Sequence, residues 1–223
     1  MKIDNLKLEH FNNGISIIQS DNYYKFTQDA ILLAKFCNIK HSDNVLELCA
    51  GSGVISFYTY SLCPYSHLYF NEIQAEMCEI IKENIEFNNL ARRSKIFNCN
   101  LKDLSLSEFK KPLDVIICNP PYFKLGDNSK INERPEIALS RHEIEATLED
   151  IIKKSSELLK DKGRLYMVHI ASRSAELISL CIKYHLEPKK IKFIFNGDKD
   201  AYLVLMEAVK GAKSGVIIQK NNN

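Results

Sequence analysis

The chain reads Val45-Leu46-Glu47-Leu48-Cys49-Ala50-Gly51-Ser52-Gly53 where a short apolar run meets a loop with two glycines. The first four residues are typical of a buried strand, and the glycines that follow permit a tight turn. Apolar residues at helical spacing resume at about Val54 and predict a helix. A strand, a glycine turn and a helix in this order are the opening unit of a parallel α/β sheet.

The alternation of apolar runs and helical segments continues along the chain. Further strands are expected at residues 67–70, 95–97, 113–118, 164–169, 191–195 and 202–209, and further helices at 74–89, 148–159 and 174–184. The run 113–118 is almost purely apolar and suits a central strand buried on both faces. Gly163 is expected to end the helix that precedes the strand at 164–169. The inner face of the helix at 74–89 is predicted to be Ala75, Cys78, Ile81, Ile85 and Asn89.

The last two predicted strands are separated only by residues 196–200. This connection is too short for a parallel crossover, so the pair should be antiparallel. The sequence therefore predicts an α/β, Rossmann-like fold with a seven-stranded, mainly parallel sheet that ends in an antiparallel pair.

Three segments divide the chain. Residues 44–210 are expected to form a single domain, which the length of 223 residues can supply with a full core. Residues 1–43 contain a predicted hairpin (6–11 and 15–19) and a helix at 28–37, and we interpret them as a flap on the first strand of the domain. Residues 211–223 are a C-terminal tail, and its last four residues are expected to be disordered.

Composition limits the classes of protein to consider. Hydrophobic residues make up 45% and charged residues 26%, as in a soluble globular protein, and no apolar run is long enough to span a bilayer. The first residues lack the pattern of a signal peptide. The seven cysteines include no Cys-x-x-Cys pair, which favours reduced thiols in the cytoplasm over a metal site. A net charge of +2 neither requires nor excludes nucleic acid as a partner.

The glycine loop is a candidate cofactor site, because ligands of open α/β sheets bind at the carboxyl ends of the strands. Ser56 stands where the third glycine of a dinucleotide fingerprint would be, and no Gly-Lys-Ser/Thr follows. The acidic Glu47 would repel phosphate, but it suits a ligand that carries an amino group and a sulfonium. These features favour S-adenosylmethionine, with Glu47 directed at its amino acid moiety.

Two later strands end in polar residues that fit the same ligand. Glu72 can accept hydrogen bonds from both ribose hydroxyls, and Asn100 can bind the adenine amino group. The simpler interpretations are a carboxylate at a helix N-terminus for Glu72 and a turn former for Asn100. The candidate cofactor-binding residues of the strand ends are Glu47, Cys49, Gly51, Gly53, Glu72, Ile73, Asn100 and Leu101.

Asn119-Pro120-Pro121-Tyr122 follows the most apolar strand directly. The prolines stop the strand and direct Asn119 out of the sheet. The lone pair of a conjugated NH₂ nitrogen is delocalised, and two hydrogen-bond acceptors can localise it and aim it at a methyl group. The Asn119 side-chain oxygen and the Pro120 carbonyl are such a pair, Tyr122 can stack on a flat substrate, and no strong base is needed. The four residues are therefore the candidate catalytic group, whereas the simpler interpretation is a strand-ending turn.

The chain resembles the bacterial tRNA methyltransferases that modify N6 of adenosine 37 in valine tRNA. The matching segments are residues 21–30 (Asp-Asn-Tyr-Tyr-Lys-Phe-Thr-Gln-Asp-Ala), 45–56, 119–123 and 141–143, within a resemblance that covers about residues 5–210. It implies a class I methyltransferase fold and places Phe26, Thr27, Gln28 and Asp29 over the methionine end of the cofactor. Without the family, Thr27 is an N-cap for the helix that follows. Relatives often carry Asp where this chain has Asn100, which bears on cofactor affinity.

A tRNA substrate requires cationic and aromatic side chains near the catalytic turn. The long polar loop after the turn supplies the RNA-binding candidates, which are Phe123, Lys124, Lys130, Arg134, Arg141 and His142. Further charge is present at Arg92-Arg93, at Lys189-Lys190 and at Lys192, although each cluster also suits a solvated face. His142 and Glu143 either help to position the substrate or form a charge pair at a helix start.

Other functions use the same turn. A protein glutamine methyltransferase presents the same nitrogen chemistry, but such enzymes usually carry a helical substrate domain, and only about 43 residues precede the first strand here. A non-catalytic RNA-binding scaffold is the second alternative, against which the intact Asn119 and Glu47 argue. DNA also remains open as a substrate. We expect a cytoplasmic monomer or weak homodimer that binds tRNA and neither a metal nor a membrane.

Overall fold

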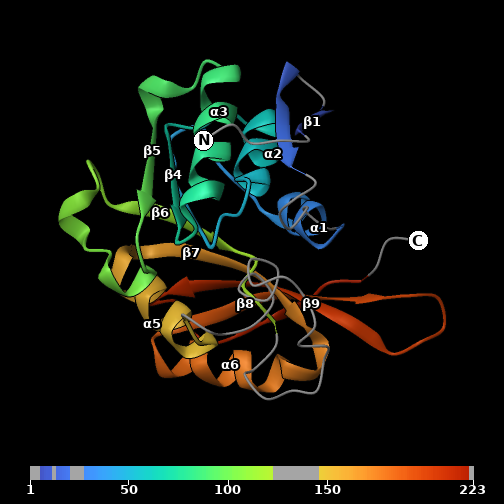
Figure 1. The fold of residues 1–223 in the computed structure, drawn as a ribbon. Helices are drawn as coiled ribbons and strands as arrows, with labels where there is room; N and C mark the ends of the chain where they lie inside the picture. Colours follow the sequence, from blue (N-terminus) through green and yellow to red (C-terminus); the bar gives the residue numbers. More distant parts are fainter. Residues whose placement is uncertain (1–5, 12–13, 21–27, 123–145, 221–223) are drawn as a thin grey trace.

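The computed structural model describes residues 6–11, 14–20, 28–122 and 146–220 (Figure 1). Its central feature is an eight-stranded sheet in the order β10-β8-β9-β7-β6-β3-β4-β5. The strands are β3 (Asn44–Leu48), β4 (His67–Glu72), β5 (Ser94–Asn98), β6 (Leu113–Cys118), β7 (Leu159–Ile170), β8 (Leu186–Phe195), β9 (Ala201–Lys210) and β10 (Ile217–Ile218). The pairs from β5 to β7 are parallel, and β9 is antiparallel to both β7 and β8.

The predicted fold class is thus confirmed, including the antiparallel pair at the end. The one addition is β10, which pairs with β8 in the parallel sense through two residues of the predicted tail. An exposed two-residue strand carries too little apolar periodicity to be recognised in a sequence.

Helices cover the sheet on both faces (Figure 1). The first face carries α1 (Gln28–Phe36), α2 (Val54–Leu62) and α3 (Ala75–Phe87), and the second carries α5 (Leu148–Leu158) and α6 (Ser174–Lys183). Successive strand residues serve opposite faces, as the pleat requires. Val45 packs with the α1–α3 side, whereas Leu46 packs with the α5 and α6 side. Burial on both faces explains why the central strands are continuous apolar runs.

The inner face of α3 differs from the prediction at both ends. The residues that it buries are Met77, Cys78, Ile80, Ile81, Asn84 and Ile85. Ala75 is exposed at the helix start, and Asn89 is exposed with a φ of 57°. The helix ends at Phe87, so Asn89 belongs to the turn that follows and cannot continue the helical face.

Gly163 does not end the preceding helix as predicted. α5 stops at Leu158, and Leu159 is already extended as the first residue of β7. Gly163 lies inside β7, next to Lys162 with a φ of 59°, where the pairing with β6 shifts register. A Cβ at Gly163 would lie 2.9 Å from the Lys160 carbonyl oxygen, so this irregularity in the strand requires glycine.

The N-terminal hairpin of β1 (Leu6–His10) and β2 (Ser16–Ser20) lies against α3 and α2. Its anchors are two asparagines of α3 and the turn after it. The side-chain amide of Asn84 bonds both the backbone N–H and the carbonyl of Ile18, and Asn88 does the same at Ser16. These side-chain amides bond backbone groups of β2 that a neighbouring strand would otherwise bond. Asn84 also donates to the Ser52 carbonyl at 3.2 Å, which connects the hairpin to the glycine loop.

Candidate cofactor and substrate site

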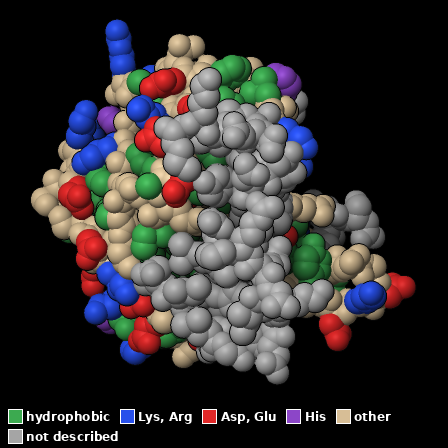
Figure 2. Space-filling model, viewed as in Figure 1, with side chains coloured by type: hydrophobic (Ala, Val, Ile, Leu, Met, Phe, Trp, Pro, Cys, Tyr) green, Lys and Arg blue, Asp and Glu red, His purple; other side chains and the backbone are tan. Residues whose placement is uncertain are grey.

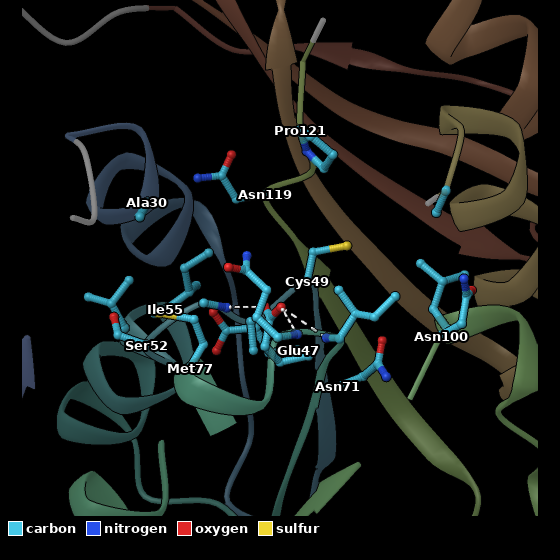
Figure 3. A pocket seen from close by; sticks show the side chains of 18 of the residues that line it. Ala30, Glu47, Cys49, Ser52, Ile55, Asn71, Met77, Asn100, Asn119 and Pro121 are labelled. Atoms are coloured by element: carbon cyan, nitrogen blue, oxygen red, sulfur yellow. Dashed lines mark hydrogen bonds between the residues drawn. The ribbon is translucent and has the colours of Figure 1, made fainter. Parts of the chain in front are cut away.

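A pocket opens at the carboxyl ends of β3, β4, β5 and β6 (Figure 3). Asn119 and Pro121 lie on one side of it and Glu47, Asn71 and Met77 on the other, with Cys49 between them (Figure 3). The lining residues are Ala30, Glu47, Cys49, Ala50, Gly51, Ser52, Val54, Ile55, Asn71, Glu72, Ile73, Gln74, Met77, Cys99, Asn100, Leu101, Asn119, Pro121 and Ala146. One cavity therefore brings together the glycine loop, two acidic strand ends and the Asn-Pro-Pro turn.

The glycine loop between β3 and α2 depends on left-handed backbone conformations. Cys49, Gly51 and Gly53 have φ values of 53°, 54° and 77°. A Cβ at Gly53 would lie 2.9 Å from the Phe70 ring and 3.0 Å from the Phe57 ring, so only glycine fits there. A Cβ at Gly51 would have no atom within 4 Å, which leaves the backbone at this position open to a ligand.

Glu47 lies at the base of the pocket and is only 1% exposed. Its carboxylate accepts a hydrogen bond from the Ser56 backbone N–H, in the first turn of α2, at 2.8 Å. Burial raises the pKa of Glu47 to about 7, although the hydrogen bonds from Ser56 oppose this rise, and the nearby charge of Glu72 adds to it. A cation in the pocket would favour the ionised form, so this carboxyl is poised to bind a positively charged ligand.

Glu72 connects the glycine loop to the end of β4. One carboxylate oxygen accepts from the Gly51 N–H at 2.8 Å, and the other accepts from the Ile73 and Gln74 N–H groups at 2.9 and 3.0 Å. Burial raises the pKa of this carboxyl. Glu72 thus has the simpler role considered above, since it binds the backbone just before α3. Carboxylate oxygens accept more than one hydrogen bond, so this role is compatible with ribose binding.

Asn100 lines the pocket and also acts as a turn former, which is the simpler interpretation given above. Its side-chain oxygen accepts from the Lys102 N–H at 3.0 Å and caps a short 3-10 helix, η3 (Leu101–Asp103). Leu101 is buried beside it and contributes an apolar wall. The pair therefore offers a polar edge and a flat apolar surface where an aromatic base can lie.

Ten lining residues were not among the sequence candidates, and Asn71 and Met77 are two of them. Asn71 is buried in β4 and donates to the Cys99 carbonyl at 2.9 Å, which fixes the ends of β4 and β5 relative to each other. A polar residue at the end of an apolar strand was the signal available for it. Met77 reaches the pocket from the first turns of α3, and its apolar character gave no signal distinct from that of a core residue.

The catalytic candidates form a hydrogen-bonded turn after β6. Pro120 is buried, whereas Asn119 and Pro121 line the pocket. The Tyr122 hydroxyl lies 2.6 Å from the Asn119 side-chain oxygen and 3.2 Å from a carboxylate oxygen of Asp29 in α1. The Tyr122 ring lies against His169, with 5.3 Å between the centroids. The turn thus contacts α1 through Asp29 and β7 through His169, and it presents the Asn119 amide at the same cavity as Glu47.

Some candidates lie elsewhere. Gln28 is exposed at the start of α1, whereas Asp29 reaches the catalytic turn through Tyr122. Arg92 and Arg93 precede β5 and so lie at the amino ends of the strands, opposite the pocket. The candidates that fall outside the described residues are Phe26, Thr27, Phe123, Lys124, Lys130, Arg134, Arg141, His142 and Glu143.

The described part of the surface has no single large basic area in the view of Figure 2, where Lys and Arg alternate with Asp and Glu. In β8, Lys190 forms an ion pair with Glu207 at 2.7 Å, and Lys189 donates to the Lys213 and Gly215 carbonyls. Both lysines are therefore committed to local contacts. Within the described ranges, no three His, Cys, Asp or Glu side chains gather as metal ligands, and no helix is long and apolar enough to cross a membrane.

Comparison with known proteins adds to this geometry. A family model described as "Methyltransferase small domain" matches residues 25–187. Among curated relatives, a tRNA1(Val) (adenine(37)-N6)-methyltransferase of a Flavobacteriaceae bacterium is 24% identical over 69% of this chain and 62% of that protein. A protein of the same name from Vibrio vulnificus is 27% identical over 81% of this chain and 73% of its own length. Among solved structures, a predicted O-methyltransferase of Agrobacterium tumefaciens has the same fold, with a TM-score of 0.66 at 21% identity over 86% of this chain and 85% of that one.

Proposed function

The chain belongs to the methyltransferase small domain family, and on this premise we propose that it transfers a methyl group from S-adenosylmethionine to the exocyclic N6 amine of an adenosine in tRNA. The observation that carries the proposal is that one pocket joins Glu47 and Glu72 to Asn119. The names of the relatives from Flavobacteriaceae and Vibrio vulnificus favour adenosine 37 of valine tRNA as the target.

The polar groups that line the pocket fit S-adenosylmethionine. Glu47 is a buried carboxyl that favours a cation, and Glu72 has acceptor capacity for ribose hydroxyls. Among the described residues that line the pocket, none is Lys or Arg, so the cavity does not have the charge that a phosphate requires. Gly51 would allow the ligand to approach the backbone, and Asn100 with Leu101 would hold the adenine.

The turn after β6 would hold the nucleophile. When bound, S-adenosylmethionine supplies an electrophilic methyl group on its sulfonium. The Asn119 side-chain oxygen and the Pro120 carbonyl accept the two N–H bonds of the substrate amine and aim its lone pair at that group. No base is needed before transfer, because the nitrogen loses its extra proton to solvent only after it becomes cationic. The Tyr122 hydroxyl lies beside Asn119, and the ring would stack on a base that has left its helix.

We further propose that the protein binds tRNA in the cytoplasm. The polar loop after Tyr122, with Lys130 and Arg141, would contact the tRNA around the methylated base. The protein would act in the cytoplasm as a monomer or weak homodimer, with its cysteines reduced. On the face shown in Figure 2, the described Lys and Arg side chains are interspersed with acidic residues.

The test is methyl transfer to tRNA from a strain that lacks this gene. The purified protein with radiolabelled S-adenosylmethionine should label this tRNA, and tRNA from the parent strain should remain unlabelled because its site is already methylated. Asn119→Ala is the matched control for a contaminating activity. Failure to label tRNA, together with labelling of a glutamine in a peptide-chain release factor, would overturn the proposal in favour of a protein glutamine methyltransferase.

A further inference from the structure

The hydroxyl of Tyr122 lies between two acceptors in this structure. Its oxygen is 2.6 Å from the side-chain oxygen of Asn119 and 3.2 Å from a carboxylate oxygen of Asp29. A phenol has one proton to donate, and neither a carboxylate nor an amide oxygen has one to give in return. The hydroxyl can therefore satisfy only one of the two acceptors at a time, and the shorter distance assigns it to Asn119.

This arrangement conflicts with the role of Asn119 in methyl transfer. The oxygen that accepts from Tyr122 is the one that has to accept an N–H of the substrate amine. An amide oxygen has two lone pairs, and the Tyr122 hydroxyl at 2.6 Å uses one of them and occupies the space beside it, so it competes with the substrate amine for access to this oxygen. The competition is resolved if the hydroxyl turns to its second acceptor when the substrate arrives.

We propose that Asp29 is a positioning residue that takes the hydrogen bond of the Tyr122 hydroxyl and so frees the Asn119 oxygen for the substrate amine. The inference rests on the methyl transfer proposed above. It assigns to Asp29 a role different from the cofactor contact that the family resemblance implies. A bond from a hydroxyl to a carboxylate is shorter and stronger than one to an amide, so this exchange favours substrate binding.

The surroundings hold both partners at the required distance. Asp29 lies in the first turn of α1, and Ala30, Leu33 and Ala34 bury that helix against the domain. Figure 3 shows the Asn119 amide directed toward α1 at Ala30. On the other side, Arg173 donates to the backbone carbonyl of Tyr122 at 3.0 Å. The backbone of the turn is thus fixed, and moving the hydroxyl by about 0.5 Å gives an ordinary O–H···O distance to Asp29.

The test is a double-mutant cycle with the full-length protein, the cofactor and tRNA. Asp29→Ala should lower kcat/KM for tRNA about tenfold, the effect of one lost hydrogen bond, because the hydroxyl then stays on Asn119. Tyr122→Phe keeps the ring but removes the competing donor. In the Tyr122→Phe background, Asp29→Ala should therefore lower kcat/KM less than twofold further. Asp29→Asn retains an acceptor and should stay within threefold of the wild-type protein.

Two readouts distinguish positioning from a cofactor or structural role. The Kd of S-adenosylhomocysteine should change less than twofold in Asp29→Ala, and the melting temperature should match that of Glu76→Ala, which removes an acidic residue from the first turn of another helix. Equal losses from Asp29→Ala in both Tyr122 backgrounds would overturn the inference. A parallel rise in the Kd of S-adenosylhomocysteine for Asp29→Ala and Asp29→Asn would also overturn it.

Different results would contradict the role of Asp29 and the proposed tRNA substrate. If the wild-type protein labels a glutamine amide instead of tRNA, the proposed substrate is wrong, and the same cycle is measured with the glutamine substrate. If Asp29→Ala then lowers kcat/KM less in the Tyr122→Phe background than in the wild-type background, the role of Asp29 is supported, since an amide nitrogen competes for the same oxygen. An equal loss of kcat/KM in both backgrounds, with either substrate, would overturn the inference.

Discussion

Glu47 should make cofactor binding depend on pH in the neutral range. Its pKa in the free protein is about 7, because burial disfavours the charged form. A ligand with an ammonium group binds the ionised carboxyl, so lowering the pH makes the ligand compete with a proton. Affinity should therefore fall as the pH decreases through 7 and level off above 8. The perturbation that removes this behaviour is Glu47→Gln, which is uncharged and close in shape.

The magnitude follows from the pKa of about 7. About one eleventh of Glu47 is ionised at pH 6 and about ten elevenths at pH 8, so the apparent Kd should differ about tenfold between these conditions. Glu47→Gln should give equal Kd values at both pH values. At pH 8 it should bind at least about tenfold more weakly than the wild-type protein, as expected for a lost hydrogen bond to a charged group.

The assay is calorimetric titration with S-adenosylhomocysteine, which carries the ammonium group and does not react. 5′-Methylthioadenosine is the matched ligand control, because it keeps the adenine and ribose but lacks the amino acid. Its Kd should be the same at pH 6 and pH 8. A pH-independent Kd of S-adenosylhomocysteine for the wild-type protein, or a tenfold dependence that persists in Glu47→Gln, would refute the role of Glu47.

Three further substitutions test other parts of the site and fold. Asn119→Ala should lower methyl transfer at least about a hundredfold, as loss of a preorganised polar group does, with the Kd of S-adenosylhomocysteine within threefold of wild type. Loss of cofactor binding in the same titration would mean that the turn is structural. Gly53→Ala should destabilise the protein by about 1–3 kcal/mol in thermal unfolding, because φ is 77° and the new Cβ would lie 2.9 Å from the Phe70 ring. An unchanged melting temperature would contradict the close contact. Asn84→Ala should cost about 2–3 kcal/mol and speed amide exchange of Ile18, since both backbone groups of Ile18 lose their partner. Exchange at the wild-type rate would show that the hairpin does not depend on α3.

The sheet could be predicted from the sequence because each central strand is buried on both faces and is therefore an apolar run. Residues 113–118 were expected to be a strand, and β6 spans Leu113–Cys118. The short connection at 196–200 likewise predicted the antiparallel pair of β8 and β9. Parallel strands have their carboxyl ends at one edge of the sheet. The sequence therefore predicts that Glu47, Glu72, Asn100 and Asn119 share a site, and all four line one pocket.

What the sequence did not predict depends on contacts between distant segments. The hairpin is held by Asn84 and Asn88, whose amides pair with β2 across more than sixty residues of chain. Gly163 is required by the irregularity in β7, and not by a helix end. The hydroxyl of Tyr122 meets Asp29 only because α1 packs beside the catalytic turn. Local patterns carry no signal for pairings of this kind.

The atom that receives the methyl group tests the account most directly. tRNA methylated by the purified protein is digested to nucleosides, and the product is identified by chromatography and mass spectrometry against authentic standards. Because Asn119 and Pro120 are expected to accept both N–H bonds of one amine, the account predicts N6-methyladenosine as the new nucleoside. The appearance of 1-methyladenosine or a ribose-methylated nucleoside instead would contradict it.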